Sequence, residues 1–179
     1  MEFPSTFEGR KAEIVALFTS SFTESEGAEE GQMIAELVTE IFATTAKEDL
    51  FAFFAQDQGQ ICACILLTRM QYGEDDRTVF LLSPVAVATD QQGKGIGQAL
   101  LRHGLDHLKE HGADVVLTYG DINFYSRVGF VQITEDDAAA PMPLSFPHGW
   151  LGQSLRSAAL EPLRGAASCV TAFRQPDLW

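Results

Sequence analysis

Hydrophobic side chains recur at helical spacing in two segments near the N-terminus. They lie at 14, 15, 17, 18 and 22 in the first segment and at 33, 34, 37, 38, 41 and 42 in the second. Apolar positions at i, i+3 and i+4 line one face of a helix, so the pattern predicts helices at 12–22 and about 29–45. The acidic stretch 25–31 interrupts the pattern and predicts a loop.

Three strand-like apolar runs follow, at 50–55, 61–68 and 79–87. A turn sequence at 56–59 separates the first two, and a polar stretch at 72–77 precedes the third, so an antiparallel meander is predicted. Pro84 lies within the third run. Because proline cannot donate to a β-ladder, it predicts a bulge or a splayed edge there.

Helical spacing returns after Gly93 and ends near Gly112, which suits a helix C-terminus. The apolar run 115–118 then predicts a strand. A strand–helix–strand crossover of this kind implies parallel neighbours. Downstream, the pattern predicts a short helix at about 123–127, a strand at 130–133, a long loop at 135–150 and a final strand at 168–173.

The stretch between the third run and the helix carries Gly93, Gly95 and Gly97. A glycine loop that leads into a helix N-terminus favours anions, because the first-turn amides have no intrahelical partner and the aligned peptide dipoles are positive there. The stretch therefore predicts a site for a diphosphate-bearing ligand across residues 92–98. The alternative is a turn that only lets the helix pack on its strand.

Two common phosphate motifs do not fit this loop. A Walker A loop needs Ser or Thr after its lysine, and Lys94 is followed by Gly95. A dinucleotide fingerprint needs a third glycine at position 98, where Gln98 stands. A nucleotide triphosphate or dinucleotide enzyme is therefore disfavoured. The spacing that remains is Gln92-x-x-Gly95-x-Gly97.

Composition narrows the class of partner. The chain of 179 residues has a net charge of −13, with 12 Lys and Arg against 25 Asp and Glu, which disfavours nucleic acid and anionic membranes and suits a cationic acceptor or solubility alone. We expect one domain at 1–179. No apolar run is long enough for a membrane span, and the N-terminus lacks signal-peptide features, so a cytoplasmic location is expected.

The cysteines and histidines do not predict a metal site. Cys62 and Cys64 alternate in a strand-like run, and with Cys169 they are expected to be buried, small apolar residues. The histidines at 103, 107 and 111 share one helix face. No carboxylate partner stands at a matching spacing, so exposed histidines without a metal are expected.

At the loop the sequence resembles the GNAT superfamily of acyl-CoA-dependent N-acetyltransferases, whose pyrophosphate loop is [Gln/Arg]-x-x-Gly-x-[Gly/Ala] between a bulged strand and a helix. The later stretch from Asn123 to Phe130, with Tyr125 before Gly-Phe, resembles the family's second signature. The resemblance implies a mixed α+β fold. Its central, mostly antiparallel, twisted sheet is splayed before the loop and flanked by helices, and residues 1–7 would supply a first strand.

The resemblance also implies a reaction. Acetyl-CoA would be the co-substrate, and a primary amine, on a small molecule or a peptide, would attack its thioester directly. Backbone groups of the strand end would pair with pantetheine and stabilise the oxyanion, and Tyr125 would be the general acid, with Tyr119 as second candidate. The implied cofactor-binding residues are Val85, Ala86, Val87, Gln92, Gly93, Lys94, Gly95, Ile96, Gly97 and Gln98.

Two departures from the family pattern leave alternatives open. The strand 79–87 carries no carboxylate for a general base, so Glu74, Asp75, Asp76 and Asp121 remain candidates. The family's usual asparagine is replaced by Thr118. A non-catalytic acyl-CoA sensor or interaction module is therefore the second hypothesis. The acceptor and the oligomeric state stay open, although members often form homodimers through their terminal strands.

Overall fold

The computed structural model describes residues 1–4 and 6–179, and the contacts between residues group them into two compact units. The first unit is Met1–Leu67 with Pro84–Gly104, and the second is Thr68–Ser83 with Leu105–Trp179. The expectation of one domain over the whole chain stays a prediction.

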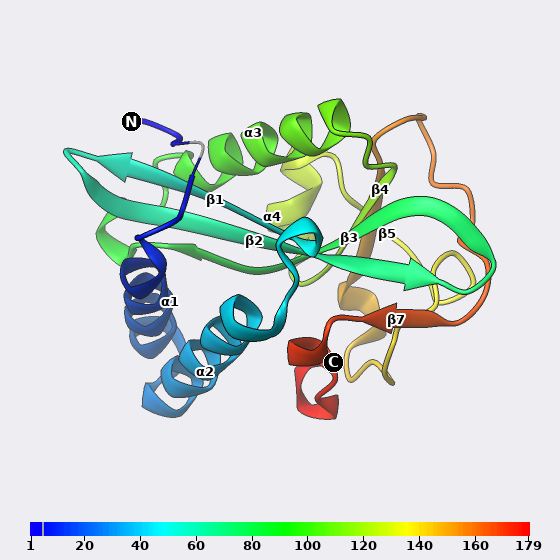
Figure 1. Ribbon diagram of the computed structural model, residues 1–179, viewed down its shortest axis with the longest axis horizontal. Coiled ribbons are helices and arrows are strands. Elements are labelled where there is room, and N and C mark those ends of the chain that lie inside the picture. The colour runs from blue at the N-terminus through cyan, green and yellow to red at the C-terminus, as the bar shows by residue number, and fades with distance from the viewer. Residues whose placement is uncertain (5) are drawn as a thin grey trace. The chain divides into compact units, whose positions relative to one another are not determined.

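Two helices of the first unit, α1 (Lys11–Glu26) and α2 (Ala28–Thr44), pack against each other, as Figure 1 shows in blue and cyan. The predicted loop at 25–31 is wrong, since Gly27 alone separates the helices, with a φ of +106° that favours glycine. Gly31 lies inside α2. A Cβ there would come within 1.9 Å of the Thr23 hydroxyl, so its small size permits the close approach.

The predicted meander forms β1 (Leu50–Asp57), β2 (Gln60–Tyr72) and β3 (Asp75–Val87), with β2 and β3 longer than their apolar cores. Gln58 and Gly59 both have positive φ in the first hairpin. The expected strand at 1–7 amounts to one bridge, between Glu2 and Gln56. Part of that expectation, Ser5, lies outside the described residues.

The second unit contains β4 (Val115–Tyr119), which pairs in parallel with β3 over the registers Val79–Val115 to Leu82–Thr118. The strand β6 (Trp150–Ser154) is antiparallel to β4 and to β5 (Val131–Gln132). The sheet order is β1-β2-β3-β4-β6-β5, and β7 (Ala167–Cys169) pairs with β2. The expected mixed α+β class and mostly antiparallel sheet are confirmed.

The loop expected at 135–150 is confirmed over 135–149, and the strand β6, which begins at Trp150, was not predicted. Burial drives this strand, since Trp150 is fully buried and its Nε1–H donates to the Ala138 carbonyl at 2.8 Å. The final strand ends at Cys169, and Thr171–Phe173 form a turn of 3₁₀ helix.

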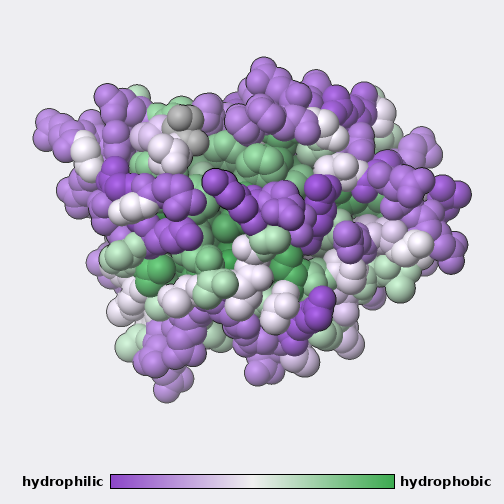
Figure 2. All heavy atoms as spheres, in the orientation of Figure 1, coloured by the Kyte–Doolittle hydropathy of each residue, from purple (hydrophilic) through white to green (hydrophobic). Residues whose placement is uncertain are grey.

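The remaining helices are α3 (Ile96–Glu110) and α4 (Ile122–Tyr125). The predicted C-terminal glycine after α3 is confirmed, because Gly112 has a φ of +90°. Hydrophilic residues predominate on the face in Figure 2, with smaller hydrophobic areas between them. Among the residues that the structure describes, no helix is both long and apolar enough to span a bilayer.

Candidate active site

The glycine loop of the first unit has the backbone that an anion site needs. Gly93 and Gly95 have φ values of +75° and +77°, and a Cβ at either would meet no atom within 4 Å. The helix begins at Ile96, and the first helical bond runs from the Ala99 amide to the Gly95 carbonyl at 3.0 Å. Residues 92–95 are exposed, so their backbone is open to a ligand.

Two loop side chains fold back onto the protein. The Gln92 amide Nε2 donates to the Val87 carbonyl at 3.1 Å, and Lys94 Nζ donates to Gln91 Oε1 at 3.1 Å. The Ser21 hydroxyl also donates to the Val87 carbonyl, at 3.3 Å. Gln92 therefore ties the loop to the end of β3, which leaves the backbone amides and the Lys94 charge to meet an anion.

The strand end that was predicted to meet pantetheine is partly exposed. Val85 and Val87 are half-buried and Ala86 is buried, and β3 runs through Pro84 as one strand. Its register with β4 ends at Leu82–Thr118, two positions before Pro84. The Val87 carbonyl already accepts two side-chain hydrogen bonds, so the remaining backbone groups of Val85–Val87 are the candidates for contact with a ligand.

The helix positions of the predicted cofactor set are more enclosed than the loop. Ile96 and Gly97 are buried and Gln98 is half-buried in the first turn of α3. These three residues contribute amide groups of a helix N-terminus, where the dipole favours negative charge. The loop and first turn thus fit a diphosphate by their backbone, with Lys94 as the nearby cation.

Tyr125 of the second unit is held by aromatic and backbone contacts. Its ring lies edge-on to Phe124 and Phe130, with centroids 5.0 and 5.6 Å apart. A Cβ on Gly120 would come within 2.7 Å of the Tyr125 ring, so only glycine admits the ring in this position. Burial raises the pKa of Tyr125 above its ordinary value near 10, and its hydrogen bond with Thr118 opposes part of that rise.

Sequence reasoning identified Thr118 only as a departure from the family pattern, and it missed both the contact of Thr118 with Tyr125 and the role of Gly120. The buried Thr118 hydroxyl donates to the Leu82 carbonyl at 2.8 Å and is a hydrogen-bond partner of Tyr125. It therefore links the tyrosine to the point where the β3–β4 register ends. The signal available in the sequence was a polar residue near the end of an apolar strand run, with a glycine two positions later.

The second tyrosine candidate is already engaged. The Tyr119 hydroxyl accepts a hydrogen bond from the Phe146 amide at 2.6 Å, and its ring stacks on Trp179 at 6.4 Å. These contacts give Tyr119 a structural role, which favours Tyr125 as the acid.

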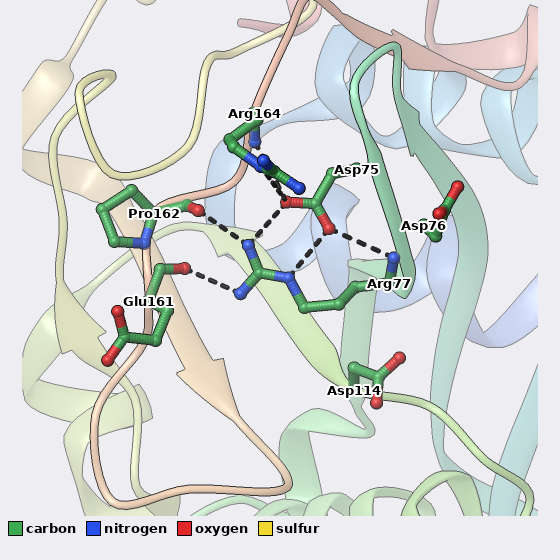
Figure 3. Close-up of a pocket in the computed structure, with 7 residues that line it drawn as sticks. All are labelled: Asp75, Asp76, Arg77, Asp114, Glu161, Pro162 and Arg164. Carbon is green, nitrogen blue, oxygen red and sulfur yellow. Dashed lines mark hydrogen bonds and ion pairs between the residues drawn. The ribbon is translucent and has the colours of Figure 1, made fainter.

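Two of the four carboxylates considered for a general base, Asp75 and Asp121, have structural contacts, and Figure 3 shows those of Asp75. Asp75 is 4% exposed and accepts both arms of the Arg77 guanidinium, at 2.9 and 2.7 Å, as well as the Arg164 amide at 3.1 Å. The hydrogen bonds from Arg77 hold the pKa of Asp75 well below its usual range. Asp121 caps α4 by accepting from the Asn123 amide at 2.9 Å. The lowered pKa makes Asp75 a poor proton acceptor.

The histidines at 103, 107 and 111 were expected to be exposed, but only His111 is, since His103 and His107 are half-buried. His103 packs on Phe3 and Phe53, while His107 and His111 stack at 3.9 Å. The three cysteines are buried and free, as expected. Over residues 1–4 and 6–179, no group of three or more His, Cys, Asp or Glu side chains is placed to hold a metal ion.

The protein has a mixed α+β fold with an open sheet, and its glycine loop leads into the N-terminus of α3. These features define the class of protein to which it is compared. The model of the acetyltransferase (GNAT) family matches residues 11–130. The chain belongs to the GNAT family of acetyltransferases.

Known relatives and solved structures agree with this assignment. The uncharacterized N-acetyltransferase YjhQ of Escherichia coli K12 is 31% identical over 141 residues, which are 76% of this chain and 77% of that protein. YhbS of Escherichia coli, solved in complex with CoA, has a TM-score of 0.80 at 23% identity, covering 97% and 92% of the two chains. A Brucella melitensis GNAT acetyltransferase with acetyl-CoA has a TM-score of 0.73 at 22% identity, covering 96% and 97%.

Proposed function

We propose that this protein transfers the acetyl group of acetyl-CoA to a primary amine by direct attack. The observation that carries the proposal is the glycine loop, whose exposed backbone at residues 92–95 leads into the N-terminus of α3. Its relatives are N-acetyltransferases, and solved neighbours hold CoA or acetyl-CoA. The proposal includes the prediction that residues 1–179 act as one domain.

Binding would rest on the backbone. The amides of Gly93–Gly97 would hold the diphosphate, where a helix N-terminus favours negative charge. Free backbone groups of Val85–Val87 would pair with the amides of pantetheine. An amide N–H of this strand end would polarise the thioester carbonyl, and a donor fixed at the developing oxyanion contributes about 3 to 4 kcal/mol.

The transfer breaks one bond and forms one bond. The neutral amine nitrogen attacks the thioester carbon, the C–S bond breaks as the oxyanion collapses, and the electron pair leaves on sulfur. Tyr125 donates its phenolic proton to that thiolate, and the proton on the acetylated nitrogen passes to water. The phenolate then regains a proton from solvent.

The environment of Tyr125 suits this acid role. Because burial raises its pKa, Tyr125 is protonated at neutral pH and can donate, and its hydrogen bond with Thr118 opposes part of that rise. No base is assigned, since no observation singles out one of the four candidate carboxylates. The amine is therefore proposed to react in its neutral form, so turnover should rise with pH until the amine is deprotonated.

A second candidate is an acyl-CoA-binding module without catalysis. The observation that favours it is the commitment of Asp75 to Arg77, which removes a buried carboxylate from proton transfer. A thiol-release assay with acetyl-CoA and a panel of small amines and peptide N-termini separates the two. Thiol release that depends on the amine supports the transferase. Tight CoA binding without release by any amine supports the module.

A further inference from the structure

The Ser21 hydroxyl on α1 differs from the other hydroxyls that hydrogen-bond along this helix. Those of Thr19, Ser20 and Ser25 donate to carbonyl groups of α1 itself, as hydroxyls within helices often do. Ser21 instead donates to the Val87 carbonyl at the end of β3, at 3.3 Å. Ser21 is also buried, at 5% exposure, whereas its neighbour Ser20 is exposed. Ser21 therefore joins α1 to the strand end.

The peptide unit between Val87 and Ala88 is held at both of its polar ends. Its carbonyl oxygen, on Val87, accepts from Ser21 Oγ at 3.3 Å and from Gln92 Nε2 at 3.1 Å. Its N–H, on Ala88, donates to the Cys62 carbonyl of β2 at 2.8 Å. Helix α1, the glycine loop and β2 thus fix the plane of one peptide unit within the first unit of the structure.

This peptide unit determines which way Val87 faces. Successive residues of a strand direct their backbone groups to opposite edges, so only every second residue bonds to a given neighbouring strand. Because the Ala88 N–H bonds to β2, Val87 directs both its carbonyl and its N–H to the other edge. Two donors occupy the carbonyl, so the N–H is the group of Val87 that can pair with the carbonyl of a pantetheine amide.

Of the two donors to the Val87 carbonyl, Ser21 is the more rigid. Gln92 is exposed, and its long side chain loses several rotatable torsions when it is held in one position. Ser21 has a single torsion between its Cα and its hydroxyl oxygen, and it lies on a helix of 16 residues. Its burial also excludes water from the bond. The hydroxyl of Ser21 therefore holds the carbonyl at a smaller entropic cost.

We propose that Ser21 is a positioning residue for the CoA site. It acts through Val87: its hydroxyl holds the peptide unit 87–88, so that the Val87 N–H is already aimed when pantetheine arrives. This inference rests on the proposed function, since it requires CoA to bind at the strand end. It extends the site from the glycine loop and the strand end to α1.

The first measurement needs no ligand. Ser21→Ala removes one of the two donors to the Val87 carbonyl, so the Ala88 amide should exchange with deuterium about fivefold faster in the free protein. Ser20→Ala removes an exposed hydroxyl that donates within α1, and as the matched control it should leave this exchange unchanged. Residue-resolved NMR measures both. An unchanged Ala88 rate in Ser21→Ala would overturn the proposal.

A double-mutant cycle on CoA affinity, measured by isothermal titration, tests whether Ser21 and Gln92 act on the same carbonyl. Ser21→Ala and Gln92→Ala each leave the Val87 carbonyl one donor, and each should weaken CoA about threefold. The double variant leaves neither, and should lose at least about threefold more than the product of the single losses. Ser21→Ala combined with Lys94→Ala should lose only the product, because Lys94 donates to Gln91.

The outcomes separate this inference from the proposed function. Full CoA affinity in Ser21→Ala, or a double variant that loses only the product, would reject the role of Ser21 while CoA binding itself stands. Tighter binding by Ser21→Ala would mean that Ser21 competes with pantetheine for the carbonyl, and would also reject it. Absence of CoA binding by the unmodified protein would reject the proposed function. Because alanine favours helices and adds no atoms here, Ser21→Ala should fold, which far-UV circular dichroism checks.

Discussion

The glycine loop and the surroundings of Tyr125 are built in opposite ways. The loop offers a ligand its backbone rather than its side chains. A Cβ placed at Gly93 or Gly95 would meet no atom within 4 Å, and residues 92–95 are exposed. Tyr125 is positioned by side chains packed on it, with Gly120 admitting its ring and Thr118 bonded to its hydroxyl. Substitutions in the loop should therefore act on binding, and substitutions around Tyr125 should act on turnover.

The largest expected effect is that of Tyr125→Phe on turnover. Loss of a general acid lowers kcat by about 100-fold or more, while CoA affinity should stay within about twofold because the loop is untouched. Thiol release measures the first quantity and isothermal titration the second. Tyr119→Phe, which removes a structural hydrogen bond, is the control and should retain kcat within about threefold. Equal losses in both variants would reassign the acid.

Next in size is the effect of Gly95→Val on CoA binding. A β-branched residue is strained at a φ of +77°, so the loop should rearrange and CoA should bind at least about tenfold more weakly. Gly112→Val is the matched control, because Gly112 has a φ of +90° and open space but lies after α3. Titration and thermal unfolding of both variants check this. Similar CoA affinity in the two would remove the loop from the binding site.

A smaller effect is expected for Thr118→Val, which keeps the shape of the side chain. Losing the hydrogen bond with Tyr125 should lower kcat about tenfold. That bond lowers the pKa of Tyr125, so its loss should raise this pKa further and move the alkaline limb of the pH–rate profile to higher pH. The profile from about pH 6 to 10.5 measures the shift. A limb that moves to lower pH contradicts the assigned contact.

The smallest effect on turnover is expected for Asp75→Asn. The variant should retain kcat within about twofold. Its free energy of unfolding should be lower by roughly 2 kcal/mol, because Arg77 loses its carboxylate partner. The pKa of Asp75 is lowered on folding, so its contribution is present above the unfolded value of about 4 and is lost as pH falls through the folded value. The difference in free energy of unfolding between the unmodified protein and Asp75→Asn should therefore be largest at pH 7 and shrink in strong acid. A large loss of kcat would restore Asp75 as a base.

The contrast between the two regions also explains what the sequence could predict. The helices, the meander and the parallel β3–β4 pair follow from apolar periodicity, and the glycine loop follows from local backbone rules. The strand β6 was missed because its burial comes from distant partners, such as the Ala138 carbonyl that accepts from Trp150. The roles of Thr118 and Gly120 were missed for the same reason, since each depends on a contact with Tyr125.

The one-residue break at Gly27 shows how a local signal can mislead. The acidic, glycine-containing stretch 25–31 has the composition of a loop. In the structure Gly31 serves instead as a close contact of α2 with Thr23 of α1. A glycine marks a turn where the backbone takes a positive φ, as at Gly27. Gly31 is instead required by the close packing of α2 on α1.

The most direct test of the account is one titration series of CoA against the unmodified protein, Gly95→Val and Tyr125→Phe. The account predicts equal CoA affinity for the unmodified protein and Tyr125→Phe, and at least about tenfold weaker binding by Gly95→Val. Absence of CoA binding to the unmodified protein at high micromolar concentration would contradict it.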